Sequence, residues 1–230
     1  MMALVDFECP QMSDVARNNA KQVLMVATAA AAWFALLLQF PLTMRTSIDN
    51  GMNVIGAILT YFSFFTLLTN LIVALVLTFS LLAPNSSLGR FLSSPVATTG
   101  TALYIAMVAV VYSTLLRHVW DPEGLDKLAD ILLHDVVPVM YVIFWIFFVP
   151  KSRLRWKNAL SWAIYPLIYL AWILIRGAIS GRYPYPFVDV SRLGYAPVLR
   201  NSGVLLSLFL GISLAVIAVA RWKPSKTVAS

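Results

Sequence analysis

Charge and cysteine are both scarce in this 230-residue chain, of which 12% is charged and 60% is hydrophobic. No soluble domain needs that much apolar surface, so the composition excludes a soluble globular protein. The single cysteine, Cys9, excludes an intramolecular disulfide and a cysteine metal cluster. The two histidines are too few for a catalytic zinc site, which commonly takes three protein ligands. The chain also lacks a Gly-x-Ser-x-Gly elbow and a phosphate-binding glycine loop, and we expect no metal or other cofactor.

Six long apolar runs fill most of the chain instead. They cover about residues 21–40, 54–82, 96–116, 131–149, 159–179 and 203–220. Each is near or above the ~20 residues with which a helix crosses a bilayer. In lipid, a helix satisfies its own backbone hydrogen bonds, so these runs predict helices. The sequence therefore predicts an all-α integral membrane protein, in which residues 1–230 form a single bundle of six transmembrane helices.

Basic residues are distributed unevenly over the two sides that six spans define. The side with both termini carries ten Lys and Arg residues and three acids, whereas the other side carries seven of each kind. The side richer in Lys and Arg normally faces the cytoplasm, so we expect both termini there. The loop 151–157, with four basic residues, then touches anionic lipid headgroups, and the net charge of +7 does not indicate a nucleic-acid partner. The short tails fit a bacterial inner membrane.

Ionisable residues inside the spans are few, and by default they mark either a functional site or a necessary ion pair. They all lie toward the non-cytoplasmic side and comprise Arg117, His118, His134, Asp135 and Arg176. This clustering predicts a site near that membrane surface. The alternative is that these ionisable residues have only a structural role, with Asp135 as the counter-ion of Arg117 or Arg176.

The second span adds a stripe of small and polar side chains that includes Thr60, Ser63 and Asn70. Helical geometry places Thr66 at the border of this stripe and Thr69 nearly opposite its centre. If one of these threonines is chemically active, Thr66 is therefore preferred. The alternative is that small polar residues only allow the helices to pack closely.

Two further segments carry candidate residues. In the fourth span, His134 and Tyr141 share one face. A histidine suits proton transfer near neutral pH. The alternative is a structural histidine that only hydrogen-bonds a neighbouring carbonyl. Residues 180–189 contain two prolines and two tyrosines, among them Tyr183. This segment predicts either a rigid cap over the mouth of a pocket or an ordinary interfacial aromatic belt.

These motifs together resemble the androgen-induced gene 1 family, and more closely its bacterial six-span relatives. The resemblance covers nearly the whole chain and is carried by Phe65-Thr-Leu-Leu-Thr-Asn70, by His134-Asp-Val-Val-Pro138 and by Gly181-Arg-Tyr-Pro-Tyr-Pro-Phe-Val-Asp189 before Gly194. It implies an integral-membrane hydrolase with a threonine nucleophile and a histidine partner on another helix. In the animal members the substrates are fatty acid esters of hydroxy fatty acids.

Transferred to this chain, the resemblance makes Thr66 the nucleophile and His134 its base, with Thr69 as an alternative nucleophile. Asn70 is then a candidate oxyanion donor, and Asp135 a supporting group. The expected partner is a membrane lipid or a lipid-like substrate, whose contacts include Arg176, Arg117, Tyr141 and Tyr183. The oligomeric state is left open.

The predicted spans place the two reactive residues at different depths. Thr66 lies about twelve residues into the second span, or ~18 Å by helical rise, while His134 lies only about four residues into the fourth. The two residues meet only if the second helix starts outside the hydrocarbon or the fourth helix begins deeper in the membrane than the predicted span. The second hypothesis is a non-enzymatic membrane protein, either a small-solute transporter or a binding and scaffold component.

Overall fold

The computed structural model describes residues 13–119 and 121–222, and in these ranges it contains six helices long and apolar enough to cross a membrane. They are Asp14–Asp49, Phe65–Leu82, Pro95–Leu116, Gly124–Phe148, Lys157–Ser180 and Tyr195–Trp222. The prediction of an all-α bundle of six apolar helices is confirmed. Cys9 and the terminal charges Asp6, Glu8, Lys223 and Lys226 lie outside the described residues.

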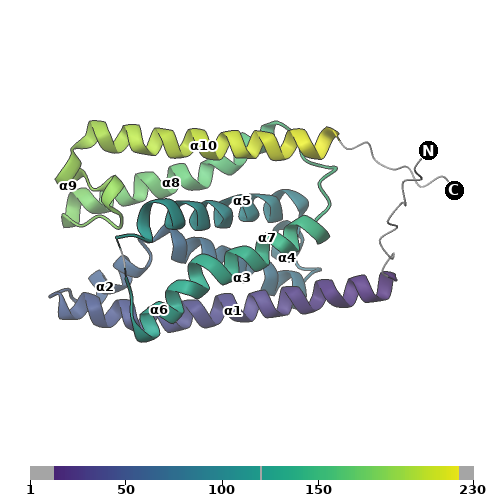
Figure 1. Ribbon diagram of the computed structural model, residues 1–230, viewed down its shortest axis with the longest axis horizontal. Helices are drawn as coiled ribbons and strands as arrows, with labels where there is room; N and C mark the ends of the chain where they lie inside the picture. Colours follow the sequence, from purple (N-terminus) through teal and green to yellow (C-terminus); the bar gives the residue numbers. More distant parts are fainter. Residues whose placement is uncertain (1–12, 120, 223–230) are drawn as a thin grey trace, which may run out of the picture.

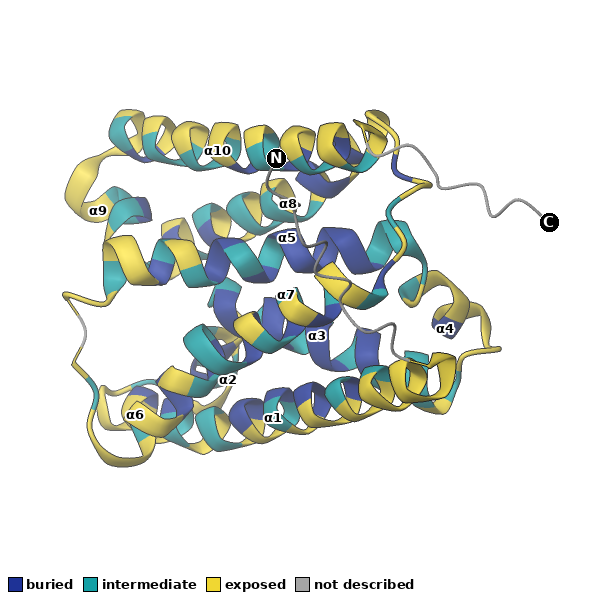
Figure 2. Ribbon diagram, turned by 45° about the vertical axis from the view of Figure 1, so that its right-hand side comes forward, coloured by how far each residue is buried: buried dark blue, intermediate teal, exposed yellow. Residues whose placement is uncertain are grey.

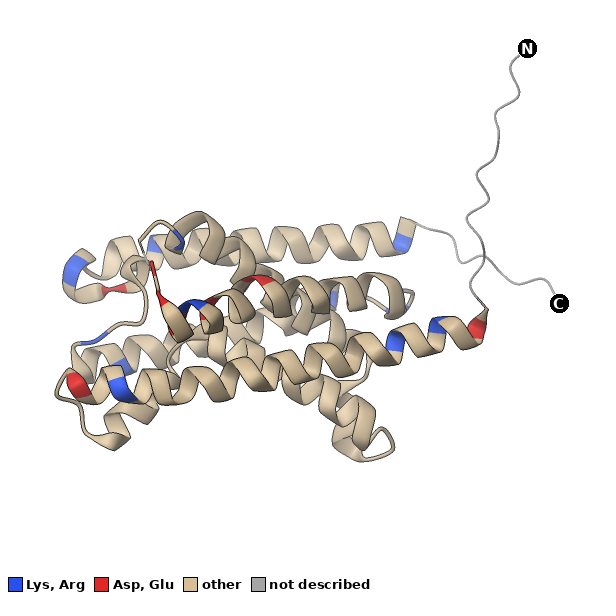
Figure 3. Ribbon diagram, turned by 60° about the horizontal axis from the view of Figure 1, so that its bottom comes forward, with Lys and Arg blue, Asp and Glu red and all other residues tan. Residues whose placement is uncertain are grey.

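The helices run side by side, as Figure 1 shows, with α1 (Asp14–Asp49) and α10 (Tyr195–Trp222) on opposite flanks. Helix α1 begins and α10 ends at the same end of the bundle. The short helices α2 (Val54–Tyr61) and α9 (Val190–Leu193) and the start of α6 (Gly124–Ile131) gather at the other end. This second end also carries most of the acidic residues, as Figure 3 shows. We call it the acidic end.

The second predicted span is not one helix. Helix α2 ends at Tyr61, and α3 (Phe65–Leu82) begins after a break that leaves Phe64 extended. The break contains no glycine or proline. Part of it is stabilised from another helix, because the Tyr169 hydroxyl donates to the Ser63 carbonyl at 2.8 Å. A backbone carbonyl freed inside a membrane protein needs such a partner. After α3, the short helix α4 (Ser87–Leu92) leads into the next span.

Two other spans contain a π-helical turn. Helix α5 (Pro95–Val111) continues as η1 (Tyr112–Leu116), and α6 continues through η2 (Leu132–Val136) into α7 (Val137–Phe148). Pro138 cannot donate a backbone hydrogen bond, and η2 ends two residues before it. The fourth span thus begins at Gly124, seven residues before the predicted start at 131. Single π turns inside α-helices are frequent at functional sites.

The remaining elements are α8 (Lys157–Ser180), the 3-10 turn η3 (Pro186–Val188), and α9 and α10. The buried apolar residues form separate clusters. The largest packs α1, α3, α5 and α7 together through small residues such as Ala32, Ala35 and Ala74, while a second joins α5 to α8 and α10 around Trp162 and Phe209. Helices α8 and α10 therefore lie as a pair against a four-helix core, and Figure 2 shows that much of their outer surface is exposed.

Candidate functional site

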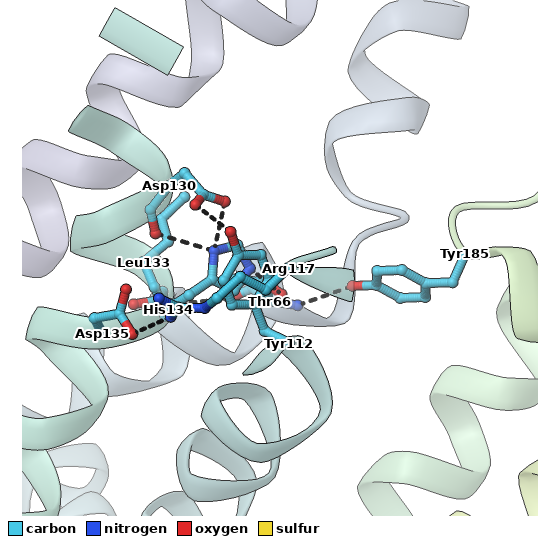
Figure 4. A network of polar contacts seen from close by, with 9 residues as sticks. Thr66, Tyr112, Arg117, Asp130, Leu133, His134, Asp135 and Tyr185 are labelled. Atoms are coloured by element: carbon cyan, nitrogen blue, oxygen red, sulfur yellow. Dashed lines mark hydrogen bonds and ion pairs between the residues drawn. The ribbon is translucent and has the colours of Figure 1, made fainter. Parts of the chain in front are cut away.

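Thr66 and His134 lie within hydrogen-bonding distance, with 3.2 Å between Thr66 Oγ1 and His134 Nε2 (Figure 4). The two departures from the predicted spans bring them together. Because α3 starts at Phe65, Thr66 lies in its first turn, and because α6 starts at Gly124, His134 lies well inside a continuous helical rod. The break before α3 and the early start of α6 thus remove the difference in depth that the sequence suggested.

The surroundings of His134 define its tautomer. Its Nδ1 atom faces two acceptors of Asp130, the backbone carbonyl oxygen and the carboxylate oxygen Oδ1, each at 3.0 Å. Both groups only accept, so Nδ1 carries the proton and Nε2 presents a lone pair to the Thr66 hydroxyl. Thr66, His134 and Asp130 therefore form a hydroxyl–imidazole–carboxylate chain, the arrangement by which a base activates a nucleophile and a third group orients that base.

Asp130 was not among the candidate residues from the sequence, because the predicted fourth span began one residue after it. In the structure Asp130 is buried, and its Oδ2 atom accepts a hydrogen bond from the Tyr112 hydroxyl. The ring of Tyr112 also stacks on His134, with ring centroids 3.8 Å apart and 14° between the planes. Tyr112 and His134 lie on the two π turns, so these irregular turns present both side chains to the site.

Asp135 and Arg117 pair with each other at the edge of this network. The hydrogen bond with Asp135 raises the pKa of the Arg117 guanidinium above its ordinary value. The guanidinium also lies over the Tyr112 ring, 5.0 Å from its centroid. The carboxylate that contacts His134 is that of Asp130, while Asp135, the neighbour of His134 in the sequence, binds Arg117 instead.

Asn70 joins the helix that carries Thr66 to the helix that carries His134. Its side-chain amide donates to the Thr66 carbonyl at 2.9 Å and to the Leu133 carbonyl at 3.2 Å. Both amide hydrogens are therefore engaged, and Asn70 holds the backbone of Thr66 in place and is not free to donate to an oxyanion. Its buried Oδ1 atom has no hydrogen-bond partner among the described residues.

Tyr185 approaches Thr66 from the opposite side to His134 (Figure 4). The Thr66 amide donates to the Tyr185 hydroxyl at 3.4 Å, and burial raises the pKa of this phenol above its ordinary value. The first amides of a helix have no partner within the helix, so the start of α3 presents donors at this point. Tyr185 was missed as an individual residue. The signal was the proline- and tyrosine-rich segment 180–189, of which residues 184–188 line the two cavities that Thr66 borders.

Three other candidates lie away from this constellation. Thr69 is fully buried and pairs with the Tyr165 hydroxyl at 3.0 Å. Tyr141 is also fully buried, and its hydroxyl lies 3.4 Å from the Thr98 carbonyl. Tyr183 packs so closely on Gly177 that a Cβ atom there would come within 2.0 Å of its ring.

The two candidate arginines differ in what surrounds them. Arg117 pairs with Asp135, whereas Arg176 donates to the Thr60 hydroxyl at 2.7 Å and to the Arg182 carbonyl at 3.4 Å. No described carboxylate forms an ion pair with Arg176. Its positive charge is therefore available to an anion, and that of Arg117 is largely neutralised.

Two cavities meet at Thr66. One of about 300 Å³ is lined by apolar side chains of α5, α8 and α10, and another of about 470 Å³ lies between α1, α2, α6 and the segment 184–186. Thr66, Tyr112, Leu116 and Tyr185 border both cavities. His134 borders only the larger one. Thr66 thus lies at the junction of the two cavities, and His134 on one side of it.

In comparisons with known proteins, no family model, no curated protein and no solved structure matches this chain.

Proposed function

We propose that this protein is an intramembrane threonine hydrolase of lipid esters, with Thr66 as nucleophile and His134 as base. The observation that carries the proposal is the contact between Thr66 Oγ1 and Nε2 of His134, whose other ring nitrogen faces Asp130. A neutral hydroxyl is a weak nucleophile until a base accepts its proton, and this arrangement supplies that base.

The reaction has two stages. Thr66 Oγ1 attacks the ester carbonyl carbon while its proton passes to His134 Nε2, and the C–O bond to the alcohol then breaks as His134 returns the proton to the leaving oxygen. Water then attacks the acyl-threonine, again giving its proton to His134. The carboxylic acid leaves, and the Thr66 oxygen regains a proton. Asp130 stabilises the imidazolium that forms in both stages.

The negative charge on the carbonyl oxygen needs donors that are already oriented. The side chain of Asn70 is occupied, so we assign this role to the first-turn amides of α3 together with the Tyr185 hydroxyl. The Thr66 amide already points toward an oxygen atom, that of Tyr185. The positive end of the helix dipole adds to the stabilisation of an anion there.

A charge near the larger cavity supports one substrate class, although Arg176 itself lines neither cavity. Arg176 binds Thr60, which lines that cavity, so a carboxylate on the alcohol part of the ester would find an unpaired guanidinium. Fatty acid esters of hydroxy fatty acids, the substrates implied by the resemblance to the androgen-induced gene 1 family, have this chemistry. We also place the protein in a bacterial inner membrane with cytoplasmic termini, so that the acidic end and the site face outward.

Labelling with a fluorophosphonate probe tests the proposal. We expect the purified wild type to be labelled, Thr66→Ala and His134→Ala to lose labelling, and Thr69→Ala to keep it. Thr69 is the matched control, because it is a buried threonine on the same helix without contact to His134. Absence of labelling in a well-folded wild type would instead favour a non-enzymatic membrane protein.

A further inference from the structure

The smaller cavity lies at the seam between the four-helix core and the α8–α10 pair. Its lining is almost entirely aliphatic and aromatic, and it includes Met107 on α5, Pro166 on α8, and Leu206 and Phe209 on α10. At about 300 Å³, it is at the lower end of the range of ligand pockets, ~300–1,000 Å³. Its size and lining suit one hydrocarbon chain.

One side of this cavity reaches the outer surface of the bundle. Leu167 on α8 is 47% exposed, Leu199 on α10 is 53% exposed, and Gly203 is also exposed. These residues lie on apolar membrane-spanning helices, so the surface that they form meets lipid. The far end, at Met107 and Phe209, is buried. Along α10 the lining runs from Leu199 to Phe209, which is ~15 Å by helical rise.

The position of His134 decides how an ester must lie across Thr66. The histidine has to return a proton to the leaving alcohol oxygen and later to accept one from water, so both must approach from its own side. His134 borders the larger cavity and not the smaller one. The leaving alcohol and the water therefore belong in the larger cavity.

We infer that the smaller cavity binds the acyl chain of the substrate, which enters from the bilayer between α8 and α10, and that the alcohol part occupies the larger cavity. This inference rests on the proposed hydrolase function. It predicts that the residues at the mouth of the smaller cavity select for the acyl chain and are indifferent to the alcohol.

Gly203 offers a clean test, because a Cβ atom there meets no other atom within 4 Å. Gly203→Leu therefore adds a bulky apolar side chain at the mouth of the cavity, from a Cβ position that is open. Gly211→Leu is the matched control: it is on the same helix, equally exposed and open, but it lines neither cavity. Gly203→Ala provides an intermediate step.

The assay compares two series of nitrophenyl and alkyl esters with protein in lipid nanodiscs. In one series the alcohol is constant and the acyl group grows from butanoyl to hexadecanoyl, and in the other the acyl group is constant and the alcohol grows. We expect Gly203→Leu to lower kcat/KM for the long acyl esters by about tenfold or more, with butanoyl esters unchanged. For the long acyl esters, kcat/KM of Gly203→Ala should lie between those of the wild type and Gly203→Leu. Gly211→Leu should match the wild type in both series.

The assay distinguishes a failure of the cavity assignment from a failure of the proposed hydrolase function. A Gly203→Leu defect that follows the alcohol series would reverse the assignment of the two cavities. A variant identical to the wild type in both series would show that the smaller cavity does not bind the reacting chain. Both outcomes would leave the hydrolase proposal intact, because the wild type is active in each. A folded wild type that hydrolyses neither series would overturn the proposed function and this inference together.

Discussion

Asp130→Asn removes the carboxylate that faces His134 while preserving the shape of the side chain. In the first step of the proposed hydrolysis His134 becomes positively charged, and the carboxylate, with Oδ1 3.0 Å from Nδ1, would stabilise that charge. Two unit charges ~4 Å apart at an effective dielectric constant of ~20 interact by about 4 kcal/mol. Losing this interaction in the transition state lowers the rate by about 10³-fold. We therefore expect Asp130→Asn to reduce ester hydrolysis on that scale.

The loss should be smaller than that from removing the base, because the Asp130 backbone carbonyl remains 3.0 Å from Nδ1 and still favours the active tautomer. The assay is the rate of fluorophosphonate labelling alongside kcat on a lipid ester. Labelling depends on activation of Thr66 and not on the pocket that binds the substrate's chain. Asp126→Asn is the matched control, because Asp126 lies one turn earlier on α6 and lines the larger cavity without contacting His134. Wild-type labelling and hydrolysis by Asp130→Asn would refute the catalytic chain.

Three further predictions follow from other contacts. Asn70→Asp replaces an amide donor with an acceptor beside two buried carbonyls, and we expect it to lower the unfolding free energy by roughly 1–3 kcal/mol, measured by thermal denaturation, and to slow labelling. Gly177→Ala places a Cβ atom within 2.0 Å of Tyr183. We therefore expect it to lower the unfolding free energy by about 1–3 kcal/mol and to displace the segment 180–189, whereas Gly211→Ala should leave the unfolding free energy unchanged. Arg176→Gln should raise KM for esters with a carboxylate on the alcohol part and leave KM for neutral esters unchanged.

Each of these predictions has its own contrary result. Asn70→Asp with unchanged melting temperature would mean that the amide does not hold α3 to η2. Equal stability of Gly177→Ala and Gly211→Ala would mean that Tyr183 moves aside freely. Arg117→Gln is the control for Arg176→Gln, because Arg117 is paired with Asp135. If Arg117→Gln alone raised KM for the anionic ester, the carboxylate would bind at that arginine instead.

Much of the architecture is visible in the sequence because membrane insertion depends on a property of each segment alone. Six apolar runs predict six helices, since the transfer free energy of a run into lipid is a sum over its own residues. The position of an ionisable residue within its span also predicts the side on which it lies. By this criterion one side gathers Arg117, His134, Asp135 and Arg176. The preference for Thr66 over Thr69 depends on one continuous helix, which the structure breaks between Tyr61 and Phe65; of the two threonines, Thr66 is the one that lies next to His134.

The features that bring the site together depend instead on contacts between helices. The break before α3 contains no glycine or proline, and its Ser63 carbonyl is satisfied by Tyr169, more than a hundred residues away. The role of Asp130 depends on α6 beginning before the apolar run, and that of Tyr185 on the path of a loop over the bundle. Hydropathy reports how favourably a segment enters the membrane, but the depth and rotation of each helix are set by packing against its neighbours. Six helices are therefore encoded locally, whereas the chain from Thr66 through His134 to Asp130 exists only once those helices are packed.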